Sequence, residues 1–446
     1  MRILVVSIGY PPRGRFGTEF YTRELVRGLS NRGHELFVFH PVRMRAKPRY
    51  TVEEVEEEGI PVFLLHNAGD PKRGFEASYR DEEVERAFAE VLERVRPDRV
   101  HFLYLVWGLS VGLPAVAEAK GIPTLLTLTD FTLACHRGQL YDHRLKRCGG
   151  PHPPETCADC IREPGPFDQP PLRRFLKRTL AHGLAGIGGL GKVVVASDLE
   201  RREKAVSEMF RTVGHVVAPT ANLASIFTRA GVPVSKLTTL VYAFDEAPFL
   251  EVRLSKEPAR PRIGFFGQFA PHKGFGTLLE AFARLEANKG PYDPDVELVL
   301  YGAPAEGRHR LFADPLLARS NSRHVTRGEP FEPDESPHVL AALTALVAPS
   351  EWDENAPLAV LQARAAGVPV VGSDVPGIAE IVVHKKHGRL FTAGDPRALA
   401  DALFAVIRGE PGRALDPGLP LSYDEHLKRI EELLGSISTP KRSRTD

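Results

Sequence analysis

Two polar side chains, Glu354 and Gln362, lie on a stretch that opens with an acidic turn and continues as a predicted helix. Pro357 places the start of this helix, because proline is tolerated only in the first turn of a helix. The first amides, near Asn355 and Ala356, then lack helical partners and can bind an anion beside Glu354. At about 1.5 Å rise per residue the two side chains lie up to roughly 12 Å apart. One can hold a sugar ring while the other reaches a ribose across a diphosphate, although an ordinary capped helix is the alternative.

A glycine-rich loop with a lysine lies earlier in the chain, from Gly267 to Gly274. It follows a predicted strand at 263–266 and precedes a predicted helix at 277–287. A loop of this kind lets backbone amides face phosphate. Lys273 in isolation would be read as a surface lysine, but its place in this junction favours phosphate binding.

These two stretches resemble the signature of the family four retaining glycosyltransferases, whose donor helix carries Glu-x7-Glu. Glu354 occupies the first acidic position, and Gln362 replaces the second, where an amide lacks the charge that strengthens hydrogen bonds to ribose. Gln268 and Lys273 match the family's loop, in which the lysine neutralises the leaving diphosphate. The resemblance implies an α/β GT-B fold, with two Rossmann-like doubly wound parallel-sheet domains facing a cleft. It also implies donor contacts from the turn residues Asn355, Ala356, Pro357 and Leu358.

Three further stretches extend the resemblance. Gly17 and Thr18 stand where the family usually has two glycines close to the diphosphate and the acceptor, so Thr18 is a departure. Asp130 ends a predicted parallel strand, where open α/β sheets place ligand sites, and a loop cap is its alternative. The family commonly has histidine at the position of Thr129. Glu380 lies in a segment similar to the one that follows the donor helix; it either lines the nucleotide site or begins a surface helix.

The resemblance implies a retaining glycosyltransferase that moves a sugar from a nucleotide-sugar donor to an unidentified acceptor, which is a glycan, a lipid-linked sugar or a small molecule. Lys273, Glu354 and Asp130 are the expected catalytic residues, and no catalytic cofactor is expected. The rival is a non-catalytic nucleotide-sugar or glycan-binding protein with the same fold. Three departures from the family pattern favour that rival, at Thr18, Thr129 and Gln362.

Short apolar runs alternate with helical patterns along the chain, which predicts two buried parallel sheets. The first has strands at 3–8, 36–40, 62–65, 100–105, 124–128 and 216–218, and the second at 263–266, 297–301, 345–348 and 368–372. The acidic run 53–58 is interpreted as a solvated face. We expect an acceptor-side domain at 1–245, a hinge at 246–260, a donor domain at 261–420, a C-terminal helix at 421–436 and a tail at 437–446. The resemblance implies that this last helix crosses back to the first domain.

All four cysteines fall close together, in a proline-rich insertion at about 135–171 with no apolar core of its own. Cys157 and Cys160 form a Cys-x2-Cys pair that Cys135 and Cys148 join, which is typical of a structural zinc. Two disulfides or unligated thiols are the alternatives. Similar insertions in some family members lie on the acceptor side of the cleft.

Composition bounds the partners and the location. The 446 residues include 58 basic and 57 acidic ones, so no broad field attracts nucleic acid. The chain enters a strand pattern at once, without the pattern of a signal peptide, which predicts a cytoplasmic location. No apolar stretch reaches the roughly 20 residues of a membrane span; the nearest is 183–196. Peripheral contact with the inner membrane face remains open, and the sequence does not indicate an oligomeric state.

Overall fold

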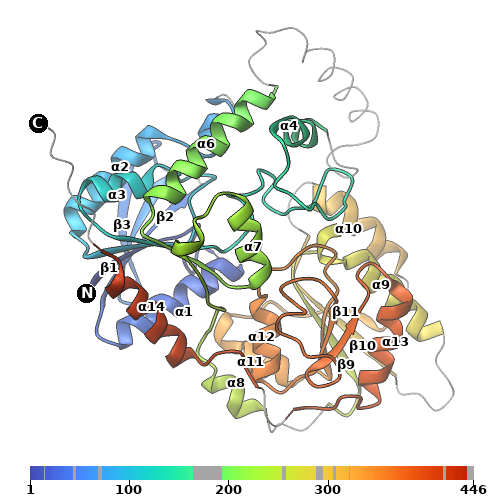
Figure 1. Cartoon of the computed structure of the whole chain (residues 1–446). Helices are drawn as coiled ribbons and strands as arrows, with labels where there is room; N and C mark the ends of the chain where they lie inside the picture. The colour runs from blue at the N-terminus through green and yellow to red at the C-terminus, as the bar shows by residue number, and fades with distance from the viewer. Residues whose placement is uncertain are drawn as a thin grey trace, which may run out of the picture.

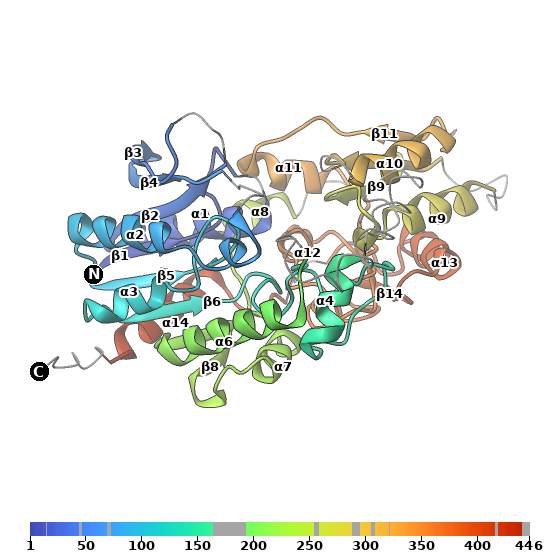
Figure 2. The same ribbon diagram turned by 90° about the horizontal axis from the view of Figure 1, so that it is seen from above.

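The computed structural model describes residues 1–438 except 15, 44–46, 69–72, 164–192, 254–257, 288–294, 305–307, 321 and 415–417. Most of the apolar stretch 183–196, part of the cysteine-bearing insertion, part of the expected hinge and the tail from 439 therefore lie outside the described residues. Two α/β domains lie side by side, each built around one sheet (Figures 1 and 2).

The N-terminal sheet has the strand order β3-β4-β2-β1-β5-β6-β7-β8. Its strands are β1 Arg2–Val6, β2 Glu35–Val42, β3 Val52–Glu57, β4 Ile60–His66, β5 Arg99–Phe102, β6 Thr124–Thr127, β7 His215–Ala218 and β8 Leu237–Thr239. All pairs are parallel except β3 with β4. The acidic run 53–58 thus contributes an edge strand, and β8 is a second strand that the sequence pattern did not predict.

Central strand β1 shows why this sheet is covered on both faces. Ile3 and Val5 belong to the apolar cluster that includes residues of helix α1, whereas Leu4 and Val6 belong to the opposite cluster with residues of α2 and α6. Alternate side chains of a strand point to opposite faces, so a continuous apolar run needs helices on both sides. The N-terminal domain is therefore doubly wound.

The C-terminal sheet is parallel throughout, with the order β11-β10-β9-β12-β13-β14. Its strands are β9 Arg262–Phe266, β10 Glu297–Tyr301, β11 Val325–Arg327, β12 Ala345–Ala348, β13 Val370–Ser373 and β14 Gly388–Phe391. Ile263 packs with residues of α9 and α13, while Leu346 packs on the other face with residues of α12. The sequence pattern did not predict β11 and β14.

The helices of the described chain follow the strands in alternation. Those of the first domain are α1 Gly17–Asn31, α2 Glu82–Val95, α3 Leu113–Ala119, α4 Pro154–Arg162, α6 Ala196–Thr212 and α7 Ala221–Arg229. Those that follow are α8 Ala247–Val252, α9 Phe275–Ala287, α10 Arg308–Arg319, α11 Ser336–Ala341, α12 Leu358–Ala365, α13 Pro396–Ile407 and α14 Tyr423–Ser436. Short 3-10 turns are η2 Glu76–Ser78, η3 Val234–Lys236, η4 Pro271–Lys273 and η5 Pro333–Glu335.

The last helix, α14, packs on the first domain beside α1 (Figure 1). Leu427, Ile430 and Leu434 are buried in the same cluster as the inner face of α1. The Tyr21 hydroxyl lies 2.9 Å from His426 Nε2, and a Cβ on Gly28 would come within 2.5 Å of a Leu427 methyl group. Glycine at 28 therefore lets the two helices approach closely.

Candidate active site

Loops at the carboxyl ends of the two sheets meet between the domains. The loop from Pro349 to Pro357, which we term the donor loop, follows β12 and contacts the first domain through several side chains. The rings of Trp352 and Phe131 lie 6.0 Å apart, and Asn355 Nδ2 donates to the Tyr242 hydroxyl over 3.0 Å. Tyr242 in turn donates to the carbonyl of Leu128, at the end of β6. Strand ends of this kind are where open α/β sheets place their ligands.

Lys273 and Glu354 form the centre of this site. Lys273 Nζ lies 2.7 Å from Glu354 Oε1, and the same oxygen accepts from Trp352 Nε1 at 2.8 Å and from the Ser350 hydroxyl. Lys273 Nζ also lies 4.7 Å from the centre of the Trp352 ring, a cation–π contact. The Glu354 side chain is 7% exposed. Burial raises the pKa of Glu354, but Lys273 and the hydrogen bonds outweigh it and hold that pKa below its ordinary value. Glu354 is therefore a carboxylate with strong hydrogen-bond partners.

Two glycines allow the loops around this pair to pack together. Gly274 has φ +66°, and a Cβ there would lie 1.7 Å from the carbonyl oxygen of Pro349. Gly377 has φ +83°, and a Cβ there would lie 2.0 Å from the carbonyl oxygen of Glu354. Neither position accepts a side chain. The glycine-rich loop and the segment after β13 thus fix the backbone on each side of Glu354.

The turn between Glu354 and α12 differs from the predicted form by one residue. Helix α12 begins at Leu358, and Pro357 is its N-cap, in an extended conformation, so the prediction that Pro357 lies inside the first turn is wrong. Proline needs no amide partner at either position. Ala356 is buried with φ +48°, a left-handed conformation that is strained for alanine. Asn355 Oδ1 is buried and has no hydrogen-bond partner among the described residues.

The two predicted glutamines of the site lie on different elements. Gln362 is on α12 and only 7% exposed. Gln268 is half-buried and follows Gly267 at the end of β9. The loops after β9 and β10 touch here, because a Cβ on Gly302 would lie 2.1 Å from the carbonyl oxygen of Gly267.

In the first domain, α1 begins at Gly17, and Thr18 follows in its first turn. A Cβ on Gly17 would meet nothing within 4 Å, so this backbone is accessible. Glu19, which sequence reasoning did not include in the site, is buried in the same turn, and burial raises its pKa. Its side chain packs against the preceding loop, since a Cβ on Gly14 would lie 2.4 Å from Glu19 Cγ. The signal that could have found it is an acidic residue in the first turn of a helix that follows a glycine-rich loop.

Asp130 lies after β6, at the edge that faces the donor loop. Its Oδ1 accepts from the Thr132 amide at 2.8 Å and from the Thr132 hydroxyl, which is the loop-capping arrangement. Burial raises the pKa of Asp130 to about 6, against the opposing effect of these hydrogen bonds. Thr129 donates to the carbonyl of Leu103 at 2.8 Å, so its hydroxyl is used within the sheet.

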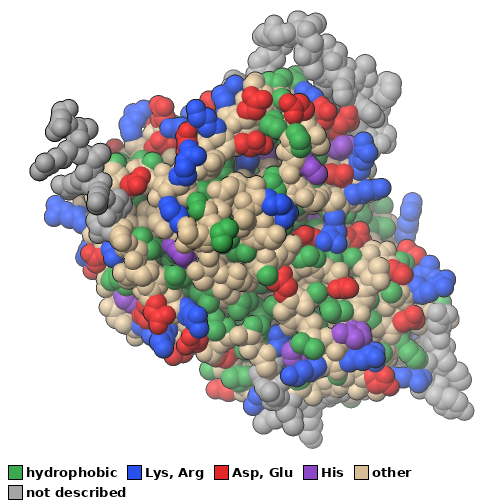
Figure 3. All heavy atoms as spheres, viewed as in Figure 1, with side chains coloured by type: hydrophobic (Ala, Val, Ile, Leu, Met, Phe, Trp, Pro, Cys, Tyr) green, Lys and Arg blue, Asp and Glu red, His purple; other side chains and the backbone are tan. Residues whose placement is uncertain are grey.

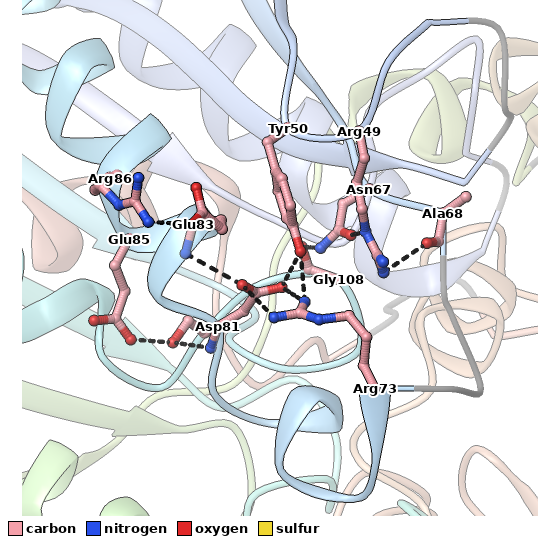
Figure 4. A network of polar contacts seen from close by, with 11 residues as sticks. Arg49, Tyr50, Asn67, Ala68, Arg73, Asp81, Glu83, Glu85, Arg86 and Gly108 are labelled. Carbon is pink, nitrogen blue, oxygen red and sulfur yellow. Dashed lines mark hydrogen bonds and ion pairs between the residues drawn. The ribbon is translucent and has the colours of Figure 1, made fainter.

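A polar network holds other loops of the first domain (Figure 4). Arg73 pairs with Asp81, the N-cap of α2, and the Tyr50 hydroxyl donates to the same carboxylate at 3.0 Å. Arg49 Nε donates to Asn67 Oδ1 at 2.9 Å. The loops that follow β2 and β4 are thereby tied to the start of α2.

Glu380 lies where the two domains meet. Its carboxylate accepts from the amides of Ala221 at 2.7 Å and Asn222 at 3.2 Å, at the start of α7 in the first domain. Negative charge at a helix N-terminus is stabilised by the helix dipole. The structure therefore gives Glu380 a contact that holds the two domains together.

The geometry of the cysteines does not support the predicted zinc. Cys135, Cys148, Cys157 and Cys160 are all free and half-buried. Among the described residues, which include all four, no group of three or more metal-binding side chains could hold a metal ion. Burial raises the pKa of Cys148 and Cys160, and raises that of Cys157 to about 11. Zinc therefore does not enter the proposed function.

Comparison with known proteins gives the family. A model described as "Glycosyl transferase 4-like domain" matches residues 16–243, and one described as "Glycosyl transferases group 1" matches residues 260–408. The first covers more than half of the chain. The two parallel-sheet domains define a GT-B fold. The chain belongs to the glycosyltransferase family that these models describe.

The similar proteins are themselves glycosyltransferases by name. A D-inositol 3-phosphate glycosyltransferase of Jonesia denitrificans is 32% identical over 196 residues, 43% of either chain. The lipopolysaccharide core biosynthesis mannosyltransferase LpsB of Rhizobium meliloti is 28% identical over 233 residues, 49% of this chain and 63% of that one. These matches span less than two thirds of the length of the relatives.

Among solved structures, Anabaena HepE in complex with UDP and glucose has a TM-score of 0.61 at 16% identity, with 98% of this chain and 100% of that chain covered. Sucrose-phosphate synthase from Thermosynechococcus elongatus has a TM-score of 0.62 at 16% identity, over 97% and 95% of the chains. Identity this low establishes the shared fold alone.

Proposed function

We propose that this protein transfers a sugar from a nucleotide-sugar donor to an acceptor sugar, with retention at the anomeric carbon. One observation carries the proposal: the ion pair between Lys273 and the buried Glu354, at the strand ends where the two domains meet. A cation beside a glycine-rich loop favours a diphosphate, and a carboxylate favours the hydroxyls of a sugar. Lys273 and Glu354 therefore bring a cation and a carboxylate to one place between the domains, where a diphosphate and the sugar attached to it can be bound side by side.

Each candidate residue has a distinct role in this proposal. Lys273 and the backbone amides of its loop neutralise the charge that develops on the leaving diphosphate. Glu354 orients the sugar hydroxyls, and Gln362 accepts a hydrogen bond from the ribose. The acceptor hydroxyl approaches from the first domain, past Gly17 and Asp130. No step in this scheme needs a metal or an organic cofactor.

The donor and acceptor classes are supported by the relatives. HepE is described in complex with UDP-glucose, which supports a nucleoside diphosphate sugar as donor here. The acceptor we propose is a sugar, either in a glycan or attached to a lipid or small molecule. LpsB is named for lipopolysaccharide core biosynthesis, and a Mycobacterium leprae relative for mannosylation of phosphatidyl-myo-inositol. With a lipid-linked acceptor, we infer a cytoplasmic protein in peripheral contact with the inner membrane face.

Two structural observations bear on other partners. Of the helices in the described part of the chain, none combines the length and apolar character of a membrane span. On the face shown in Figure 3, basic and acidic side chains are interspersed. A mixed surface of this kind does not attract a nucleic-acid backbone.

A thermal-shift panel of nucleoside diphosphates and nucleotide sugars, followed by a nucleotide-release assay with the strongest binder, tests the proposal. We expect one nucleotide sugar to stabilise the protein and to release nucleotide slowly in water and faster with an acceptor. Lys273→Ala should lower release by on the order of a hundredfold, whereas Lys204→Ala, a change at an exposed lysine of α6, should leave release unchanged. Stabilisation without release across all acceptors would instead support the non-catalytic rival.

A further inference from the structure

The segment from residues 131 to 163, which we term the cysteine segment, leaves the first domain and packs on both loops that carry the central ion pair. The Phe131 ring meets Trp352 of the donor loop, and Arg147 Nε donates to Asp353 Oδ1 at 2.7 Å. Tyr141 lies 6.3 Å from the ring of His272, the neighbour of Lys273. An acceptor-side element therefore contacts the donor machinery directly.

A pocket of about 310 Å³ lies between this segment and the second domain. Tyr141, Leu145 and Arg147 line it from the cysteine segment. The opposite wall consists of Glu351, Asp374, Thr392, Ala393 and Gly394. The volume is at the lower end of the range for ligand pockets, roughly 300–1,000 Å³.

The pocket adjoins the donor loop through Glu351. Glu351 belongs to the donor loop, and its carboxylate accepts from the hydroxyl of Thr277, in the first turn of α9 after Lys273. A ligand here would sit beside the loop that holds Glu354, with the first domain forming one wall.

The charges of the lining select the chemistry of the ligand. Asp374 is exposed, and its carboxylate makes no hydrogen bond or ion pair with the described residues. Arg147 is already neutralised by Asp353. The lining has two carboxylates, and its one guanidinium is already paired, so an anionic ligand is disfavoured. The described residues contain no group of three metal-binding side chains, which disfavours a metal ion. Carboxylates are strong acceptors for hydroxyls, while Tyr141, Leu145 and Ala393 offer an apolar surface to the C–H face of a ring.

We infer that this pocket is an acceptor subsite that binds a neutral sugar unit next to the one that receives the transferred group. The inference rests on the proposed function, because it assigns the pocket to the acceptor of that reaction. It makes the cysteine segment a determinant of acceptor specificity. The acceptor is then a neutral oligosaccharide or glycoside with at least two rings.

The test uses the full chain and a panel of neutral disaccharides built from glucose, galactose and mannose, with binding followed by saturation-transfer NMR and calorimetry. Ala393→Trp fills the pocket, and Val383→Trp is the matched control at an exposed site of the same domain, outside the pocket lining. We expect at least one disaccharide to bind the wild type. In Ala393→Trp its dissociation constant should rise on the order of tenfold or more, with no change in Val383→Trp.

Asp374→Asn provides a second variant if Ala393→Trp does not fold, and it should weaken the same disaccharide because an amide accepts hydrogen bonds from hydroxyls less strongly than a carboxylate. Nucleotide release in water, which needs the donor but no acceptor, distinguishes a failure of the subsite from a failure of the proposed transferase. Nucleotide release in water should be equal in wild type, Asp374→Asn and Ala393→Trp. The subsite is overturned if no disaccharide binds the wild type, or if both pocket variants bind the disaccharide as tightly as the wild type does. Neither result contradicts the proposed transferase. Absence of nucleotide release from the wild type overturns the transferase instead.

Discussion

Lys273 Nζ lies 2.7 Å from Oε1 of Glu354, so the cation proposed to bind the diphosphate and the carboxylate proposed to bind the sugar hydroxyls form an ion pair with each other. The donor must therefore divide this pair, with its diphosphate taking the cation and its sugar hydroxyls taking the carboxylate. The pair keeps Glu354 ionised although it is buried. Its contribution to stability is present above the ordinary carboxyl pKa and is lost as the pH falls through the lowered value.

Lys273→Ala should lower nucleotide release by on the order of a hundredfold, because the leaving diphosphate loses its cation. It should also lower the free energy of unfolding by on the order of 2 kcal/mol, since Glu354 is left buried without its counter-charge. Urea unfolding and a release assay measure the two effects. The double variant Lys273→Ala with Glu354→Gln should regain most of the stability and none of the activity. Recovery of both would mean that the pair is structural only.

Gln362→Glu should tighten nucleotide-sugar binding by on the order of 1 kcal/mol, because a carboxylate accepts hydrogen bonds from ribose more strongly than an amide. The free protein should melt at a lower temperature, since the new carboxylate would be only 7% exposed. Calorimetry and thermal unfolding measure the two changes. An unchanged or weaker dissociation constant would remove Gln362 from the ribose site.

The stability of the protein should depend on Asp130 in a defined pH window. Its pKa is raised from 3.8 to about 6, so the folded state keeps the proton to higher pH than the unfolded chain does. Stability from this group is therefore full below the ordinary pKa and declines as the pH rises to about 6. Asp130→Asn should flatten this decline in melting temperature and give a more stable protein at neutral pH. An unaltered pH profile in the variant would show that Asp130 titrates normally.

Ala356→Gly should stabilise the fold by roughly 0.5–1 kcal/mol, because glycine adopts the left-handed conformation without the strain that alanine has there. Part of this gain is offset, since glycine makes the unfolded chain more flexible. Ala359→Gly, inside α12, is the matched control and should destabilise by about 1 kcal/mol. Urea unfolding compares them. Equal destabilisation by both changes would contradict strain at Ala356.

Glu380→Ala should loosen the contact between the domains, since the amides at the start of α7 lose their carboxylate. Small-angle scattering of the ligand-free variant should show a larger radius of gyration than that of the wild type. Glu410→Ala, at another carboxylate of the second domain, serves as the control. The same radius in both variants would mean that other contacts hold the two domains together.

The sequence by itself determined the general form of this protein. Continuous apolar runs such as 3–8 and 263–266 require burial on both faces, which gives parallel sheets between helices. The loop 267–274 and the spacing of Glu354 and Gln362 gave the donor site as a hypothesis, because both depend on local backbone chemistry.

Only the tertiary structure decided which distant groups meet. Val52–Glu57 is too acidic to read as a strand, yet it pairs with β4, because an edge strand can keep its charged side chains in water. β8, β11 and β14 have three or four residues each. Segments this short form strands because a neighbouring parallel strand pairs with them. Glu380 contacts the start of α7, and no metal-binding group of three side chains is found among the described residues, because spacing along the chain does not fix the direction of side chains across a loop. Lys273 and Glu354 are far apart in sequence, and it is the folding of two loops at one sheet edge that brings their charges together.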